Sequence, residues 1–177
     1  MKKFLLCLPL ILLASCVGRP DAVTPVQGFD LDQYLGKWYE IARLDHSFER
    51  NLEKVTANYS LREDGGVAVK NRGFSTKTGS WKVSEGKAYF VGKTDEGFLK
   101  VSFFGPFYGS YVIFELDKEN YQYAFVSGPD ESYLWLLSRT PEVSDELKAR
   151  FETQAKELGF DIKNLIYVNQ AGASHSH

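Results

Sequence analysis

Few residues in this 177-residue chain have the types and spacing that covalent or acid–base chemistry requires. Asp45 and His46 are adjacent and Glu49 follows shortly after, an order that suggests a proton-transfer pair. No Ser or Cys with a fitting context accompanies them as a nucleophile, so we expect solvated charges in a loop. His175 and His177 form a His-x-His tail without further metal ligands nearby, which favours a disordered end over a metal site. No glycine-rich phosphate loop follows a strand and opens a helix, and no cofactor is expected.

The first 15 residues have the pattern of a secretory signal. Lys2 and Lys3 precede an apolar run over residues 4–13, which is too short to span a bilayer as a mature helix. The sequence Leu13-Ala14-Ser15-Cys16 resembles the lipobox of bacterial lipoproteins, in which a peptidase cuts before the cysteine and the thiol receives a diacylglycerol. An ordinary secreted protein with a chance cysteine is the alternative. The resemblance predicts lipidation of Cys16 and, because Val17 rather than aspartate follows, an anchor in the bacterial outer membrane, facing the periplasm.

Length and composition favour one cysteine-free domain. Without the first 15 of its 177 residues the chain has 162, and its net charge moves from −2 to about −4 because two lysines leave. No basic stripe is present, which argues against nucleic acid as a partner. Since Cys7 leaves with the signal and Cys16 carries lipid, packing must stabilise the fold without disulfides. Residues 16–28 are polar and rich in Pro and Gly, as in a lipidated tether, and residues 171–177 read as a disordered tail.

The region between tether and tail predicts about eight short strands joined by turns. A single helical turn capped by Asp30 or Asp32 precedes the first strand. Turns are expected at residues 64–66, 85–87, 105–106, 117–120 and 128–130. These short, even connections favour an antiparallel meander.

One amphipathic helix follows the strands. Its apolar residues are spaced along one helical face: Leu147, Phe151, Ala155 and Leu158. Ser144 is the expected N-cap and Gly159 the expected C-terminal stop. A last short strand is expected at residues 165–168. The whole pattern predicts an all-β fold, an eight-stranded antiparallel up-and-down β-barrel with one C-terminal α-helix packed outside; a β-sandwich is the alternative.

Three short motifs resemble the lipocalin family. Residues 36–42, Gly-Lys-Trp-Tyr-Glu-Ile-Ala, are similar to its first signature, G-x-W-Y-E-I-A. Asp117 with Tyr123-Ala124 resembles the second signature, with a spacing about two residues longer than usual, and residues 137–140, Leu-Ser-Arg-Thr, resemble the third. The resemblance extends over residues 29–170, which are identified as a lipocalin β-barrel domain. Runs such as ARLDHSFER and KVSFFGPFYGSY resemble the bacterial outer-membrane lipocalins in particular.

The resemblance assigns a structural role to Gly36, Trp38 and Arg139, which close the bottom of the barrel. Glycine lets the chain enter the strand closely, and the guanidinium can stack on the indole and donate to carbonyls. Glu40 shares the strand parity of Trp38 and should point inward. It is either a specificity element for a polar head group or a carboxylate bonded to inward hydroxyls.

A barrel closed at one end with an aromatic interior suits one elongated apolar molecule, and the family resemblance points to fatty acids and lysophospholipids. The candidate ligand-binding residues are Trp135, Phe103, Tyr108, Tyr111, Tyr123 and Glu40. For each aromatic residue, packing in the barrel core or against the helix is the alternative. The aromatic, glycine-rich hairpin around Tyr108 can also mark a membrane-facing tip or a homodimer surface.

Three function classes follow. A non-enzymatic lipid carrier that serves envelope maintenance or stress is favoured. A barrel enzyme would need a reactive group, and Glu40 is the one candidate that the sequence offers. A Glu40→Gln variant with unchanged activity would count against the enzyme class. A structural or partner-binding envelope lipoprotein would have a filled barrel.

Overall fold

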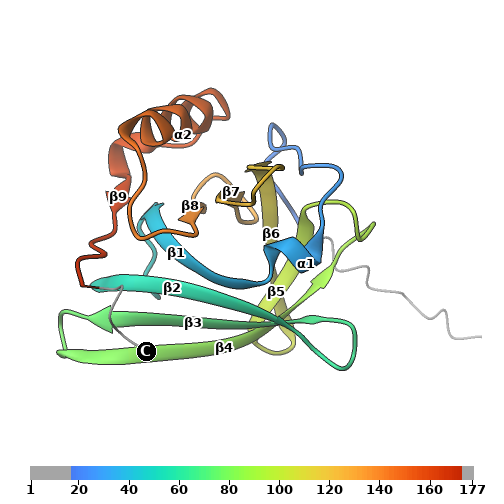
Figure 1. Cartoon of the computed structure of the whole chain (residues 1–177), viewed down its shortest axis with the longest axis horizontal. Helices are drawn as coiled ribbons and strands as arrows, with labels where there is room; N and C mark the ends of the chain where they lie inside the picture. Colours follow the sequence, from blue (N-terminus) through green and yellow to red (C-terminus); the bar gives the residue numbers. More distant parts are fainter. Residues whose placement is uncertain (1–16, 173–177) are drawn as a thin grey trace, which may run out of the picture.

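The computed structural model describes residues 17–172 as a single sheet of nine strands with two α-helices (Figure 1). The strands are β1 (Gly36–Arg43), β2 (Leu52–Leu61), β3 (Val67–Ser75), β4 (Ser80–Phe90), β5 (Phe98–Phe104), β6 (Phe107–Leu116), β7 (Tyr123–Ser127), β8 (Leu134–Ser138) and β9 (Ile166–Tyr167). The helices are α1 (Leu31–Tyr34), α2 (Asp145–Glu157) and a 3-10 turn, η1 (Ile162–Asn164).

The sheet closes on itself because β1 pairs with both β8 and β2. Trp38 lies opposite Ala57 of β2, and Arg43 lies opposite Trp135 of β8. All other neighbours in the barrel are consecutive antiparallel strands, and β9 adds to β1. The predicted up-and-down barrel is therefore confirmed, and the sandwich alternative is wrong.

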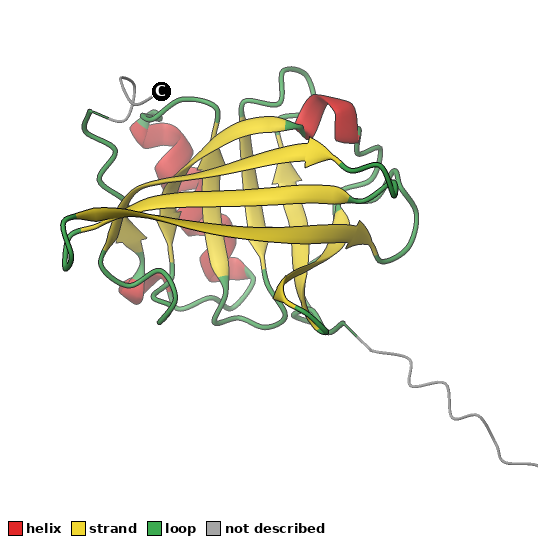
Figure 2. Ribbon diagram, turned by 90° about the horizontal axis from the view of Figure 1, so that it is seen from below, coloured by secondary structure: helices red, strands yellow, loops and turns green. Residues whose placement is uncertain are grey.

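The alternating strand directions give the barrel two different ends (Figure 2). The end at which α1 precedes β1 is called here the closed end. The connections β1–β2, β3–β4, β5–β6 and β7–β8 all lie at the opposite end, called here the mouth; they are residues 44–51, 76–79, 105–106 and 128–133. Exposed loops at one end of a rigid barrel are where ligand entry is expected.

Apolar side chains fill two separate layers because side chains alternate across each strand. One cluster lies inside the barrel, and the other lies between the barrel wall and α2, which packs outside (Figure 1). Phe151 and Ala155 of α2 are fully buried, and the Phe151 ring lies 4.9 Å from that of Phe125. The predicted helical face is confirmed, with Ser144 accepting from the Leu147 N–H as N-cap and Gly159 at φ 92° after the helix.

The predicted turns at 64–66, 105–106, 117–120 and 128–130 are present, and Asp30 caps α1. The turn expected at residues 85–87 is wrong, because β4 runs without interruption through Gly86. Glycine at this position lets β4 and β5 approach closely. A Cβ on Gly86 would lie 2.7 Å from the Ser102 carbonyl oxygen and 2.8 Å from the Phe103 ring.

The segment before α1 is packed against the barrel, unlike the free tether expected for residues 16–28. Val23 is fully buried, and the Val26 N–H donates to the Ile113 carbonyl at 2.9 Å. The Gly97 N–H donates to the Val26 carbonyl at 2.9 Å, so this segment is held from both sides. The predicted signal, Cys16 and the tail from residue 173 lie outside the described residues. Within residues 17–172, no helix has the length and apolar character needed to cross a membrane.

Candidate functional site

The closed end is built by Trp38 and Arg139, as the motifs suggested. The Arg139 guanidinium carbon lies 3.9 Å from the centre of the Trp38 ring, and the indole Nε1 donates to the Tyr34 carbonyl at 2.8 Å. Arg139 also donates to three carbonyl oxygens, those of Lys37, Gln33 and Tyr121, at 2.9, 2.7 and 3.2 Å. This arrangement ties α1, β1 and the β6–β7 turn together, so its role is structural.

Gly36 permits this closure because its φ of 91° is unfavourable for other residues. A Cβ at this position would lie 3.5 Å from Arg139 Nη1, in ordinary contact. The backbone conformation, more than space, therefore requires glycine here.

Above the closed end, the inner wall is apolar and aromatic. The buried members of the inner cluster are Phe29, Tyr34, Trp38, Tyr59, Val67, Val69, Ala88, Leu99, Ile113, Leu116, Tyr121, Ala124, Val126 and Leu137. Other inward members keep some exposure, among them Val101, Phe103, Tyr111 and Trp135. Gly109 lies opposite Val101, and a Cβ built on it would have no neighbour within 4 Å. The inner wall is thus fully packed toward Trp38 and more open on the β5–β6 side.

Three tyrosine hydroxyls meet inside the barrel. Tyr111 Oη lies 2.7 Å from Tyr34 Oη and 2.9 Å from Tyr59 Oη. Burial raises the pKa of all three phenols, so they stay neutral and exchange hydrogen bonds. They provide a polar point within an otherwise apolar wall.

A buried charged cluster lies nearer the mouth. Arg43 Nη1 donates to Glu40 Oε1 at 2.6 Å, and Arg43 Nη2 donates to the Glu49 and Leu52 carbonyl oxygens at 2.9 and 3.2 Å. Trp135 Nε1 donates to Glu49 Oε2 at 3.1 Å. Two carboxyl groups and one guanidinium are therefore held together at the entrance of the barrel.

A β-bulge makes this cluster possible. Regular alternation places Glu40 on the inner face of β1 and Arg43, three residues later, on the outer face. The pairing of β1 with β8 shifts register between Glu40 and Ala42, and the shift brings Arg43 inward as well. Arg43 is therefore a site residue that sequence reasoning missed, since a bulge leaves no clear signal in one sequence. Glu49 was noted in the sequence only as a solvated loop charge.

Burial raises the pKa of both carboxyl groups. The pKa of Glu40 lies well above its usual range because the negative charge of Glu49 adds to the effect of burial, against the opposing Arg43 charge. Burial also raises the pKa of Glu49, which the Trp135 N–H and Arg43 oppose. Burial and the proximity of the two carboxyl groups therefore make the pair retain a proton more readily than two free carboxylates, against the opposing charge of Arg43.

The cluster also contains polar atoms without partners. Gln170 Nε2 donates to the Glu40 and Val55 carbonyl oxygens at 2.7 and 2.9 Å, which fixes the C-terminal segment to β1 and β2. Among the residues that the structure describes, Arg43 Nε and Gln170 Oε1 are buried without a hydrogen-bond partner. Such atoms are uncommon in folded proteins and are suited to binding a polar group.

The loop residues interpreted as solvated charges are only partly so. Asp45 is exposed and binds Arg50, with Arg50 Nε 3.1 Å from Asp45 Oδ2. His46 and Glu49 are buried, which corrects the expectation for both. The His46 ring stacks on Tyr133 with centroids 4.2 Å apart, and burial lowers its pKa. Asp45 therefore pairs with arginine rather than with His46, and the residues do not form an acid–base pair.

The six predicted ligand-binding residues divide into two groups. Trp135, Phe103 and Tyr111 belong to the inner cluster, and Glu40 faces inward beside Arg43. Tyr108 and Tyr123 lie on the outer face, so their expected place in the cup is wrong.

Strand alternation explains both errors. Tyr111 faces inward on β6, so Tyr108, three residues earlier, faces outward, where its ring lies 6.4 Å from that of Tyr89. On β7 the inward residues are Ala124 and Val126; Tyr123 therefore faces outward, and its hydroxyl accepts from Arg150 of α2 at 2.7 Å.

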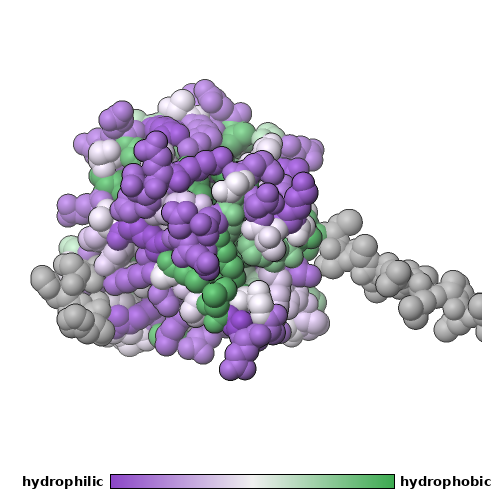
Figure 3. Space-filling model, turned by 45° about the vertical axis from the view of Figure 1, so that its right-hand side comes forward, coloured by the Kyte–Doolittle hydropathy of each residue, from purple (hydrophilic) through white to green (hydrophobic). Residues whose placement is uncertain are grey.

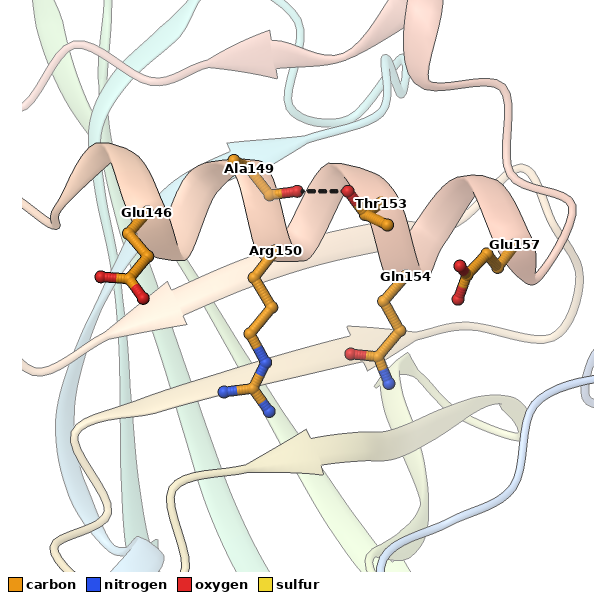
Figure 4. A pocket seen from close by; sticks show the side chains of 6 residues that line it. All are labelled: Glu146, Ala149, Arg150, Thr153, Gln154 and Glu157. Carbon is orange, nitrogen blue, oxygen red and sulfur yellow. Dashed lines mark hydrogen bonds between the residues drawn. The ribbon is translucent and has the colours of Figure 1, made fainter.

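A surface hollow along α2 does not resemble a binding site. It is lined by Glu146, Ala149, Arg150, Thr153, Gln154 and Glu157 (Figure 4). These side chains come from one helix face, and Arg150 is already bound to Glu115 at 2.7 Å. Over residues 17–172, no group of His, Cys, Asp and Glu is arranged to hold a metal ion.

Comparisons with known proteins agree with this geometry. The model of the lipocalin-like domain family matches residues 29–170. The outer membrane lipoprotein Blc of Vibrio cholerae is 61% identical over 170 residues, covering 96% of this chain and 99% of that protein. The outer membrane lipoprotein Blc of Escherichia coli (strain K12) is 54% identical over 164 residues, covering 93% and 92%. Among solved structures, insecticyanin from the tobacco hornworm Manduca sexta aligns over 90% of both chains with a TM-score of 0.70 at 22% identity, a likeness of fold.

Proposed function

Because the chain belongs to the lipocalin family, we propose that its barrel binds one long-chain lipid, a fatty acid or a lysophospholipid, and carries it within the bacterial envelope. The chain is an outer-membrane lipoprotein, like the relatives from Vibrio cholerae and Escherichia coli. A lipocalin of this kind takes up a hydrophobic ligand rather than catalysing a reaction.

The observation that carries the proposal is the contrast along the inner wall. Toward Trp38 the side chains are fully buried, whereas Phe103, Tyr111 and Trp135 keep partial exposure although they face inward. A long apolar chain would cover that remaining surface. Burying an acyl chain contributes about 0.8 kcal/mol per methylene, on the order of 10 kcal/mol in all before ordering costs.

The buried charged cluster would receive the polar end of the ligand. Arg43 Nε is free to donate, and a fatty-acid carboxylate or a phosphate accepts such bonds well. Glu40 and Glu49 limit the negative charge that the site tolerates, since an added anion would share the Arg43 guanidinium, which already binds the Glu40 carboxylate and the Glu49 carbonyl oxygen. A neutral Glu40 carboxyl would make room for an anionic head group.

The same residues also permit a second function. The inner cluster contains many large side chains, and a barrel filled by its own residues would act as a structural or partner-binding envelope lipoprotein. Ligand titration separates the two, because only a barrel with accessible inner surface binds lipid saturably.

The experiment uses the mature chain with a Cys16→Ser substitution, titrated with palmitate and with a lysophospholipid while tryptophan fluorescence is followed. We expect saturable binding of one lipid per barrel, weakened by Trp135→Ala. Trp81→Phe is the matched control, because Trp81 stacks on Arg72 at 3.7 Å on the outer face of the barrel. If neither lipid binds saturably, the carrier function is contradicted and the filled barrel is favoured.

A further inference from the structure

We propose that the barrel wall opens between β1 and β2, where a segment near the C-terminus closes a gap, and that lipid enters and leaves the barrel there. Residues 166–170 are called here the strap, and the gap that they cover is called the seam. The strap is then a gate rather than a fixed part of the wall. The inference rests on the proposed lipid binding and adds to it a route and a moving element.

The two strands beside the seam separate toward the mouth. β1 pairs with β2 only from Gly36 to Tyr39, and its last two residues pair with β9 instead. In its pairing with β8, β1 shifts register after Glu40, and β2 shifts register after Glu53 in its pairing with β3. Such bulges bend a strand and are frequent beside functional sites. The two strands therefore diverge at the level of the buried charged cluster.

The strap fills the seam with hydrogen bonds to both strands. On the β1 side the Val168 N–H donates to the Ile41 carbonyl at 2.9 Å, and on the β2 side the Lys54 N–H donates to the Asn169 carbonyl at 2.8 Å. The Gln170 side chain donates to both strands. In Figure 1 the chain after β9 runs toward the start of β2. The C-terminal segment thus completes the wall in place of a direct β1–β2 ladder.

Little side-chain burial holds the strap in place. Of its five residues only Gln170 is buried, and Ile166 and Tyr167 are 36% and 44% exposed. Segments with few buried apolar contacts and exposed hydrogen bonds open locally more readily than the core. Lys54, which the strap binds, has a φ of 52°, a conformation that a non-glycine residue keeps only where its surroundings impose it. Release of the strap would relieve this strain.

The β9 end of the strap serves as the hinge. Tyr167 Oη donates to Glu152 Oε1 of α2 at 2.6 Å, and β9 pairs with β1. The bonds to β2 come instead from Asn169 and Gln170. Release of these two residues parts the strap from β2 and leaves it attached to β1 and α2.

The seam lies directly over the charged cluster. A hollow of about 280 Å³ on the outer surface is lined by the strap, by residues 50–53 and by Thr76, and Arg43 is part of the same lining. Arg43 also binds Glu40 inside the barrel. Within the described part of the chain, Arg43 Nε and Gln170 Oε1 are buried without a hydrogen-bond partner. An open strap would present both atoms to a lipid head group.

The loop between β1 and β2 covers the same cluster more firmly. Arg43 and Trp135 both donate to Glu49, and the His46 ring stacks on Tyr133 with centroids 4.2 Å apart. His46 and Glu49 are buried, unlike most of the strap. On the face in Figure 3, apolar side chains form only narrow patches, so that face offers a lipid little surface to follow. Opening the strap is therefore the route to the cluster that breaks the fewest buried contacts.

Hydrogen exchange in the lipid-free mature chain with Cys16→Ser tests whether the seam opens. The Lys54 amide donates across the seam, whereas the Ile113 amide donates to the Gly97 carbonyl at 2.8 Å in the barrel wall and is the control. We expect the Lys54 amide to exchange at least about tenfold faster than that of Ile113. Equal exchange of the two amides would overturn the gate, whatever the protein binds.

A disulfide tests whether lipid uses the seam. Lys54→Cys with Asn169→Cys, in the same Cys16→Ser chain, places two thiols across it on residues joined by a backbone hydrogen bond. Lys37→Cys with Asn58→Cys, opposite each other where β1 and β2 already pair, is the matched control. We expect the oxidised lock to slow uptake and release of palmitate about tenfold with an unchanged dissociation constant, and reduction to restore both rates. The control pair should show the same rates in both redox states.

Equal rates in the oxidised and reduced lock, with closure confirmed by mass spectrometry, would overturn the seam as the route. Gln170→Ala tests the opposite direction, because it removes two bonds that hold the strap and should speed uptake and release together. Asn164→Ala, which loses only an exposed bond to Asp161, is its control. Altered affinity with unchanged uptake in Gln170→Ala would contradict a gate. If the unlocked chain binds neither lipid, the proposed function and the route both fail, whereas hydrogen exchange still reports whether the strap opens.

Discussion

Trp135 Nε1 donates a 3.1 Å hydrogen bond to Glu49 Oε2, and this bond joins the inner face of β8 to the loop that follows β1. Glu49 is also held through its carbonyl oxygen by Arg43, so one residue links the mouth loop to two strands of the barrel. Trp135, the residue favoured for ligand contact, is thus hydrogen-bonded to the charged cluster. Its charges can be tested separately from its packing.

Removing the guanidinium should be costly. Arg43→Met leaves two buried carboxyl groups without their shared cation, and we expect the free energy of unfolding to fall by about 3–5 kcal/mol. Urea unfolding measures this. Arg50→Met is the control, because its ion pair with Asp45 is exposed and should change stability by less than about 1 kcal/mol. Similar losses in both variants would argue against a buried, charged cluster.

Glu40 should make stability depend on pH. Its folded-state pKa lies above the ordinary 4.5, so the folded protein binds more protons than the unfolded chain between that value and the raised one. The free energy of unfolding therefore falls as the pH rises through this window. In Glu40→Gln this titration is absent, and we expect a smaller fall between pH 5 and pH 8. Parallel curves for the two proteins, from urea unfolding at several pH values, would show that Glu40 is ionised throughout.

Arg139 should affect stability without affecting the ligand. Arg139→Ala loses the contact with the Trp38 ring and three hydrogen bonds to carbonyl oxygens, and we expect a loss of about 2–4 kcal/mol in the free energy of unfolding. Lipid affinity of the folded variant should stay unchanged, because the residue lies at the closed end. A selective loss of affinity in the fluorescence titration would show that the ligand reaches the closed end and contradict this prediction.

Two glycines offer a matched test of packing. Gly86→Ala forces a Cβ to within 2.7 Å of the Ser102 carbonyl oxygen, and we expect a loss of about 1–3 kcal/mol by overpacking. Gly109→Ala meets no atom within 4 Å and should change stability little. Thermal unfolding of both variants provides the measurement; equal destabilisation would mean that the β5–β6 side of the wall is as tightly packed as β4.

The β5–β6 side of the inner wall should accept a larger side chain, which would occupy space that the lipid needs. Gly109→Leu places an apolar side chain beside Val101, on the inner wall. We expect it to lower lipid affinity while leaving the free energy of unfolding nearly constant. Unchanged affinity in the titration would show that the acyl chain lies elsewhere.

The sequence predicted the barrel because its alternation, turns and lipocalin motifs all agree, and Trp38 with Arg139 was identified from the motifs alone. The mouth cluster was only partly predictable. Glu40 follows from simple parity with Trp38, whereas Arg43 faces inward through a bulge that depends on the pairing with β8. Tyr123 was misplaced for a related reason, since the register of a five-residue strand decides which aromatic residue faces α2. Side-chain parity can be read from a sequence only as far as the register is known.

Lipid binding inside the barrel is tested most directly by photo-cross-linking with a fatty acid that carries a diazirine near its methyl end, followed by peptide mapping. We expect cross-links on the inner wall on the closed-end side of the charged cluster, at residues such as Val101 and Tyr111. Cross-links confined to outer residues such as Tyr108 and Tyr123, or none above background, would contradict a lipid-binding barrel.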